Sequence, residues 1–152
     1  VNVLPLIKTD AKSAIATSIF FPFLLFNQME SKVVATVCQS PTFDSQAMGI
    51  NITAHENVPW LDQLVTVSDD QKRITVLLVN RMPENRMKVV FNLPASPKTS
   101  LEISASHPLD ANTLDYPFKV KIQDGPKPRI QNGSWQVMLK PASVTYLEFT
   151  RA

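Results

Sequence analysis

An alternation of apolar and polar residues with a period of two recurs along this 152-residue chain and limits the folds it can adopt. Met87, Val89 and Phe91 alternate with basic and polar residues, and the stretches 100–106 and 134–140 repeat the pattern. Such alternation places one face of a strand in a core and the other in solvent. The chain is therefore predicted to form mainly antiparallel β-strands.

Short turn signals separate these stretches. Ser68-Asp69-Asp70-Gln71 predicts a hairpin, and the segments 82–85, 94–97 and 140–143 are further connections. We expect strands at 17–26, 32–39, 64–67, 74–79, 86–93, 100–106, 134–140 and 144–149, with a short strand at 118–122 inside a long connection over 110–129. At least eight strands with short loops indicate an all-β fold, an antiparallel, jelly-roll-like β-sandwich.

Composition narrows the classes of partner and cofactor. Hydrophobic residues make up 44% of the chain, enough for a core, and the net charge of +2 gives no strong attraction to nucleic acid or an anionic membrane. The longest apolar run, 19–26, is much shorter than the roughly 20 residues of a membrane helix. Gly49, Gly125 and Gly133 are too far apart for a phosphate-binding loop. We expect no cofactor, no nucleic acid and no membrane.

Nucleophilic and general acid–base catalysis find little support in the sequence. There is no GxSxG motif, and only His55 and His107 could act as a histidine base; both are expected on the surface or in loops. Glycoside hydrolysis needs two suitably spaced carboxyl groups. Six of the thirteen acids fall in turns or loops, where carboxylates are usually solvated: Asp10, Asp44, Asp69, Asp70, Glu84 and Asp124. We expect no catalytic and no substrate-binding residue in this chain.

Metal binding is also not expected, although one alternative stays open. The single cysteine, Cys38, excludes a cysteine-based zinc cluster and an internal disulfide. Asp110, Asn112 and Asp115 offer oxygen ligands at short spacing but do not complete a calcium loop. The favoured interpretation is that these side chains bond the backbone of their own loop.

Two tryptophans could in principle stack on sugar rings. Trp135 shares the alternation of Val137 and Leu139, so it is expected in the core, and packing is also favoured for Trp60. The aromatic cluster Phe20-Phe21-Pro22-Phe23, with Phe26, is typical of a core or a domain interface.

The sequence around the termini and the glycosylation patterns bears on location. Val1-Asn2-Val3-Leu4-Pro5 is not a secretory signal, and without an initiator methionine the chain is expected to be part of a longer polypeptide. Asn51-Ile52-Thr53 and Asn132-Gly133-Ser134 match the N-glycosylation pattern. These two matches favour secretion, with a cytoplasmic location as the alternative.

Six segments, in order along nearly the whole chain, resemble the C-terminal domain of glycoside hydrolase family 51 α-L-arabinofuranosidases. They are Val1-Asn2-Val3-Leu4-Pro5-Leu6-Ile7, Ser18-Ile19-Phe20-Phe21-Pro22-Phe23, Val58-Pro59-Trp60-Leu61-Asp62, Val79-Asn80-Arg81, Asp110-Ala111-Asn112-Thr113 with Asp115-Tyr116-Pro117, and Lys140-Pro141-Ala142-Ser143-Val144. Two positions depart from the family pattern: Ala111 stands where a histidine is common, and Ala142 replaces the commoner second proline.

The resemblance implies a parent enzyme that removes terminal α-L-arabinofuranosyl groups from arabinan or arabinoxylan with retention. Its two catalytic glutamates lie in a (β/α)8 barrel upstream of Val1, so no catalytic residue carries over to this chain. Residues 1–10 are expected to be the exit segment from that barrel, and 11–152 the accessory sandwich. The implied partners are the barrel, a second copy in a homo-oligomer, and the arabinose-containing polysaccharide on which the parent acts.

Three hypotheses follow from the sequence and the resemblance. A non-catalytic sandwich of an arabinofuranosidase should carry an apolar face, built partly from 1–7 and 20–26, that the rest of the enzyme covers. A stand-alone carbohydrate-binding module should instead expose a row of tryptophans. Nothing in the sequence argues for the third, a plain adhesion-type sandwich.

Overall fold

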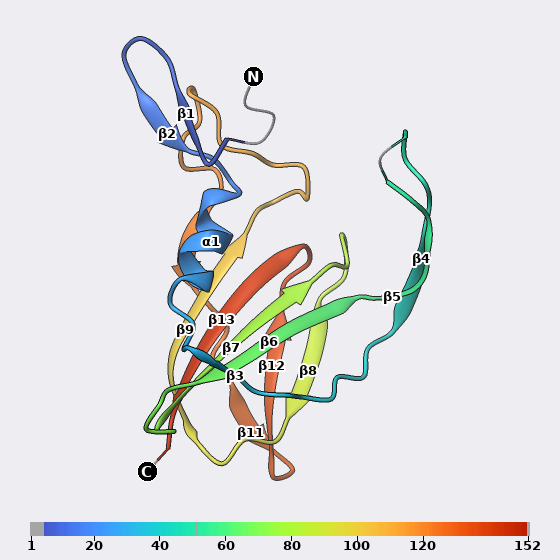
Figure 1. Cartoon of the computed structure of the whole chain (residues 1–152), viewed down its shortest axis with the longest axis vertical. Helices are drawn as coiled ribbons and strands as arrows, with labels where there is room; N and C mark the ends of the chain where they lie inside the picture. Colours follow the sequence, from blue (N-terminus) through green and yellow to red (C-terminus); the bar gives the residue numbers. More distant parts are fainter. Residues whose placement is uncertain (1–4, 51, 152) are drawn as a thin grey trace.

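Two packed β-sheets form the body of the protein in a computed structural model that describes residues 5–50 and 52–151 (Figure 1). The larger sheet has the order β10 (Lys121–Asp124), β9 (Ser96–Ser104), β13 (Ser143–Thr150), β7 (Arg73–Asn80), β6 (Leu61–Val67) and β3 (Lys32–Val33). The smaller sheet has the order β11 (Arg129–Gln131), β12 (Ser134–Leu139) and β8 (Met87–Phe91). Every pair of neighbouring strands in these sheets is antiparallel.

Two ribbons extend from this body. One joins β1 (Ile7–Thr9) to β2 (Ala14–Ala16), and the other joins β4 (Thr42–Ser45) to β5 (His55–Pro59). The helix α1 (Phe20–Phe26) follows β2 and lies against the larger sheet (Figure 1). No helix in the described part of the chain has the length and apolar character needed to cross a membrane.

The main core fills the space between the two sheets. The larger sheet contributes Leu78, Leu147 and Phe149, and the smaller sheet contributes Val137 and Leu139. Trp135 packs against this core and donates its indole N–H to the Leu93 carbonyl oxygen at 3.0 Å. The expected all-β sandwich is thus confirmed, and Trp135 lies partly buried against the core on the side that its alternation predicts.

The predicted turn at 68–71 is a hairpin between β6 and β7, in which the Ser68 N–H donates to the Arg73 carbonyl oxygen. The turns at 82–85 and 140–143 instead cross from one sheet to the other. The side-chain amide of Asn80 donates to the carbonyl oxygens of Asn85 and Lys140, at 3.0 Å and 2.7 Å. One buried asparagine therefore holds both sheet-crossing turns together.

The prediction of a strand at 17–26 is wrong, because residues 20–26 form the helix α1. The run is apolar at every position, so it lacks the period of two that distinguishes a strand from a short buried helix. Pro22 lies in the first helical turn, where a backbone N–H has no helical partner and its loss costs little. Leu25 is fully buried, and its burial on the larger sheet stabilises this short helix.

Two other expected strands are shorter or displaced. Of 32–39, only Lys32–Val33 is a strand, and the chain then leaves the sheet edge toward β4. The strand expected at 118–122 is β10, which begins at Lys121. The Asn112 side chain occupies both the N–H and the carbonyl oxygen of Val120, so these groups are not available for a β-ladder.

The alternation in 100–106 predicts that Glu102 faces solvent, but the structure buries it. It is 1% exposed, because β9 is covered on both faces. Leu101 and Ile103 point toward α1, while Glu102 points into the sandwich and pairs with Lys140 at 2.7 Å.

A second, smaller core lies under α1, where Leu25 packs with Ile103, Val120 and Tyr146. The Tyr146 hydroxyl donates to the Gln28 carbonyl oxygen, at 3.4 Å, just after the helix. Burial, with a smaller effect from the nearby Glu148, raises the pKa of Tyr146 to about 12.

This raised pKa predicts a loss of stability in strong alkali. The folded state favours neutral Tyr146, so its contribution is complete below the ordinary pKa of 10 and is lost as pH rises from 10 through about 12. A shift of this size corresponds to a few kcal/mol of stability. Urea unfolding at pH 9 to 12 should show this decline, and Tyr146→Phe should remove most of it. A decline of equal size in Tyr146→Phe would contradict the assignment.

Candidate docking surface

The elements β1 and α1 and the connection after β9 lie together at one end of the protein (Figure 1), and each of them carries exposed apolar side chains. We call these exposed apolar side chains the end surface. In or next to β1 they are Leu6 and Ile7, in or next to α1 they are Ile19, Phe23, Leu24 and Phe26, and in the connection they are Leu109, Tyr116 and Phe118. Soluble monomers rarely expose so many large apolar side chains in one region, and such patches mark interaction sites. An exposed apolar surface of this kind is suited to docking against another body.

The geometry of α1 explains why its aromatic side chains remain exposed. Leu25 points into the smaller core, whereas Phe23 and Phe26, three residues apart, share another side of the helix. Phe23 is 62% exposed and Phe26 is 56% exposed. The helix is therefore apolar on the face it buries and also on a face it presents outward, which is typical of an element between two bodies.

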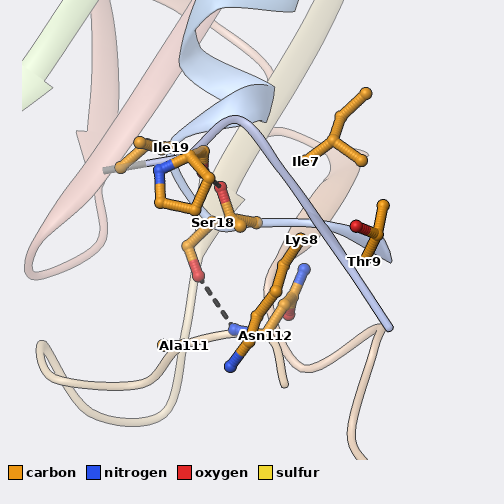
Figure 2. Close-up of a pocket in the computed structure, with 9 residues that line it drawn as sticks. Ile7, Lys8, Thr9, Ser18, Ile19, Ala111 and Asn112 are labelled. Carbon is orange, nitrogen blue, oxygen red and sulfur yellow. Dashed lines mark hydrogen bonds between the residues drawn. The ribbon is translucent and has the colours of Figure 1, made fainter. Parts of the chain in front are cut away.

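A cavity of about 580 Å³ opens within the end surface (Figure 2). The strand β1 contributes Ile7, Lys8 and Thr9, and the segment before α1 contributes Thr17, Ser18 and Ile19. Asn112 and Ala111 come from the connection after β9. The cavity is thus lined by both apolar and polar side chains, and Lys8 is the one cationic residue among the described residues that line it.

Asn112 fixes the connection to the start of the chain. Its backbone N–H donates to the Ser18 hydroxyl at 3.0 Å (Figure 2), and its side-chain amide donates to the carbonyl oxygens of Ala16 and Val120. Its amide oxygen accepts the Val120 N–H at 2.7 Å. Asn112 is 6% exposed, so these bonds are shielded from water and hold three segments in one arrangement.

Replacing Asn112 with alanine should loosen this end of the protein. The buried polar groups of Ala16 and Val120 would lose their partners, and we expect a loss of about 2 kcal/mol. Amide hydrogen exchange should accelerate most in residues 14–20 and 110–120. Asn92→Ala removes an exposed asparagine and serves as the control. Equal effects of the two substitutions would contradict the central role of Asn112.

The calcium alternative at Asp110, Asn112 and Asp115 finds no geometric support. Asp110 pairs with the Lys119 ammonium at 2.6 Å and accepts the His107 N–H, and the hydrogen bond from Lys119 is the main cause that lowers the pKa of its carboxyl. The oxygen of Asn112 is committed to Val120, and Asp115 is exposed. Within 5–50 and 52–151, no cluster of three His, Cys, Asp or Glu side chains could hold a metal ion. As favoured above, Asp110 and Asn112 bond the backbone of their own loop.

The candidate histidines and tryptophans do not line this cavity. His55 is exposed on β5, beside Thr53, and His107 is exposed in the connection, where its ring accepts the Leu109 N–H. Trp60 stacks on Phe43 with ring centroids 3.9 Å apart. Because Trp60 and Trp135 are both packed, the described residues contain no row of exposed tryptophans such as a carbohydrate-binding module requires.

The sequence singled out some residues of this surface but not their arrangement. The sequence marks Asn112 as an oxygen donor in a loop and the aromatic run at 20–26 as a core or interface, but it predicts no role at a site for Lys8 or Ser18. Ser18 is a common residue type whose partner is 94 positions away. Only the fold brings these segments together, so no local signal could have identified them.

Comparison with known proteins identifies the family of this chain and solved structures with a similar fold. It matches the family "Alpha-L-arabinofuranosidase C-terminal domain" over residues 1–143, whereas no curated protein matches it. Its fold is similar to that of the GH51 α-L-arabinofuranosidase from Thermotoga petrophila RKU-1, with 27% identity and a TM-score of 0.83, covering 97% of this chain and 32% of that chain.

The α-L-arabinofuranosidase from Thermotoga maritima, in a complex with arabinose, gives the same identity, coverage and TM-score. A family 51 α-L-arabinofuranosidase from Bifidobacterium longum, at 22% identity and a TM-score of 0.81, covers 97% of this chain and 29% of that chain and supports the fold. The chain therefore spans about a third of the length of these relatives. Since the family match covers most of its residues, this chain belongs to the α-L-arabinofuranosidase C-terminal domain family.

Proposed function

We propose that this chain is the accessory sandwich of an α-L-arabinofuranosidase and acts by stabilising the catalytic barrel of the same polypeptide. In this proposal the barrel precedes residue 1 and removes terminal α-L-arabinofuranosyl groups from arabinan or arabinoxylan with retention. Residues 1–10 form the exit segment from the barrel, and 11–152 form the sandwich. Family membership and the similarity to the two Thermotoga α-L-arabinofuranosidases support this assignment.

The end surface is the observation that carries the proposal. Its apolar side chains on β1 and α1 come from the two stretches expected to form the face that the enzyme covers. Burying about 800 Å² of apolar surface contributes on the order of 20 kcal/mol before the costs of ordering and association. Contact with the barrel would thus stabilise both domains.

The acids of the chain support an accessory role rather than catalysis. The buried carboxyl of Glu102 is bound by Lys140 and the Ser104 hydroxyl inside the sandwich, not in a cavity that a sugar enters. A retaining glycosidase needs two carboxyl groups about 5–5.5 Å apart at the scissile bond. We propose that both belong to the barrel and that this chain supplies no catalytic residue.

Activity assays on separated and joined domains test the proposal. The 152-residue chain alone should not hydrolyse nitrophenyl α-L-arabinofuranoside, whereas the parent polypeptide should. The barrel expressed without the sandwich should lose activity on heating at a lower temperature than the parent. Clear turnover by the chain alone, or equal heat resistance of the barrel with and without it, would overturn the proposal.

A further inference from the structure

The ribbon of β4 and β5 projects from the sandwich as an arm (Figure 1). Its tip carries Met48, Ile50 and Ile52, and Ile50 is 98% exposed. Met48 and Ile52 form a bridge across the tip, and Gly49 between them has a φ of 62°, which suits the turn. A two-stranded ribbon is only marginally stable in water, and an apolar tip does not stabilise it there.

The base of the arm is firmly attached to the sandwich, in contrast to its tip. The ring of Phe43 stacks on that of Trp60, and the backbone N–H of Trp60 donates to the Pro41 carbonyl oxygen at 2.9 Å. Arg81 bridges the Asp62 carboxylate and the Pro59 carbonyl oxygen. These contacts give the arm a defined direction, so it presents its apolar tip at a fixed place.

The arm and the β1–β2 ribbon project toward the same end of the molecule, on opposite sides of it (Figure 1). A single body that covers the end surface near β1 is therefore also within the reach of the arm. The chain spans about a third of the length of its structural relatives, and its family is defined as a C-terminal domain. The remaining two thirds of a similar parent supply such a body.

We infer that the arm docks through Met48, Ile50 and Ile52 on the same preceding domain that covers the end surface. This inference rests on the proposed function for the existence of that domain. One contact leaves two bodies free to rotate about it, whereas two separated contacts fix their relative orientation. The arm thus holds the sandwich in a defined orientation on its partner.

Photocrosslinking in the parent polypeptide tests the contact directly. A photoreactive benzoylphenylalanine replaces Ile50, and the matched control replaces Ile130, which is 65% exposed. Ile130 is in β11, and this strand lies at the end of the sandwich away from the arm tip (Figure 1). The probe at 50 should form crosslinks to peptides that precede residue 1, and the probe at 130 should not. Mixing isotope-labelled and unlabelled protein shows whether a crosslink lies within one chain.

Crosslinks from position 50 only to a second copy, only within the sandwich, or to no peptide would overturn the inference. Hydrogen exchange provides a second measurement. Ile50→Ser should accelerate amide exchange in residues 42–59 of the parent at least tenfold, and Ile130→Ser should leave it unchanged. Unchanged exchange in Ile50→Ser would also overturn the inference.

Arabinofuranosidase activity is measured on the same parent protein, so the two failures are distinguishable. An active parent without the crosslink refutes the arm contact alone. An inactive, folded parent that forms the crosslink refutes the proposed activity and leaves the arm contact standing.

Discussion

Replacing Phe149 with alanine should reduce the free energy of unfolding by about 4 kcal/mol. Phe149 is fully buried between the two sheets, and its ring contacts Phe91 and Trp135 edge-on, with centroids 5.7 Å and 6.0 Å away. The substitution removes the ring that fills the space between the sheets and leaves a cavity. For a domain of this size the melting temperature should fall by roughly 8–16 °C.

Urea denaturation of the chain measures this loss, and Phe118→Ala is the matched control. Phe118 is 74% exposed, so the same substitution there should change the stability of the isolated chain very little. In the parent polypeptide, Phe118→Ala should become destabilising if the end surface is covered. Similar losses for Phe149→Ala and Phe118→Ala in the isolated chain would contradict the assigned core.

Replacing Lys140 with methionine should cost about 3 kcal/mol, because it leaves a buried carboxylate without its counter-charge. Glu102 is 1% exposed, and its Oε1 lies 2.7 Å from the Lys140 ammonium. Within the described residues its Oε2 has no hydrogen-bond partner, so the carboxylate depends on the contacts of Oε1. Methionine keeps most of the apolar stem of lysine, which separates the loss of charge from the loss of packing.

A double-mutant cycle identifies the cause. Glu102→Gln in the Lys140→Met background replaces the carboxylate with a neutral amide and should recover much of the lost stability. Lys32→Met removes a lysine from the exposed pair with Asp69 and should cause no measurable change. If the double variant were as unstable as Lys140→Met, the uncompensated charge of Glu102 would not be the cause.

Sequence patterns predicted the parts of the fold where one strand face meets the core and the other meets water. In β8 and β12 the apolar residues at every second position do face the other sheet. The turn at 68–71 was also predictable, because its short polar segment separates two apolar strands that pair directly.

Patterns failed where tertiary contacts replace solvent on the second face. Glu102 follows the alternation of an exposed residue, yet it is buried, and its carboxylate binds Lys140, Ser104 and Gln123. The run 20–26 has no polar face in either conformation, so its position against the larger sheet decides that it is a helix.

Buried asparagines mark the limit of sequence reasoning about the docking surface. Asn112 and Asn80 stand in segments that resemble the family, but their roles depend on carbonyl groups 96 and 60 residues away. A sequence shows that an amide is present, and only the fold shows which backbone groups it bonds.

The position of β13 in the larger sheet has a consequence for how the domain is made. This strand lies between β9 and β7, and it supplies Leu147 and Phe149 to the main core. A ribosome delivers residues 143–150 after all the other strands, so the nascent chain holds an open gap in the sheet until then. During translation the apolar surfaces of β7 and β9 therefore remain accessible to chaperones, and the sandwich closes only when this segment has emerged.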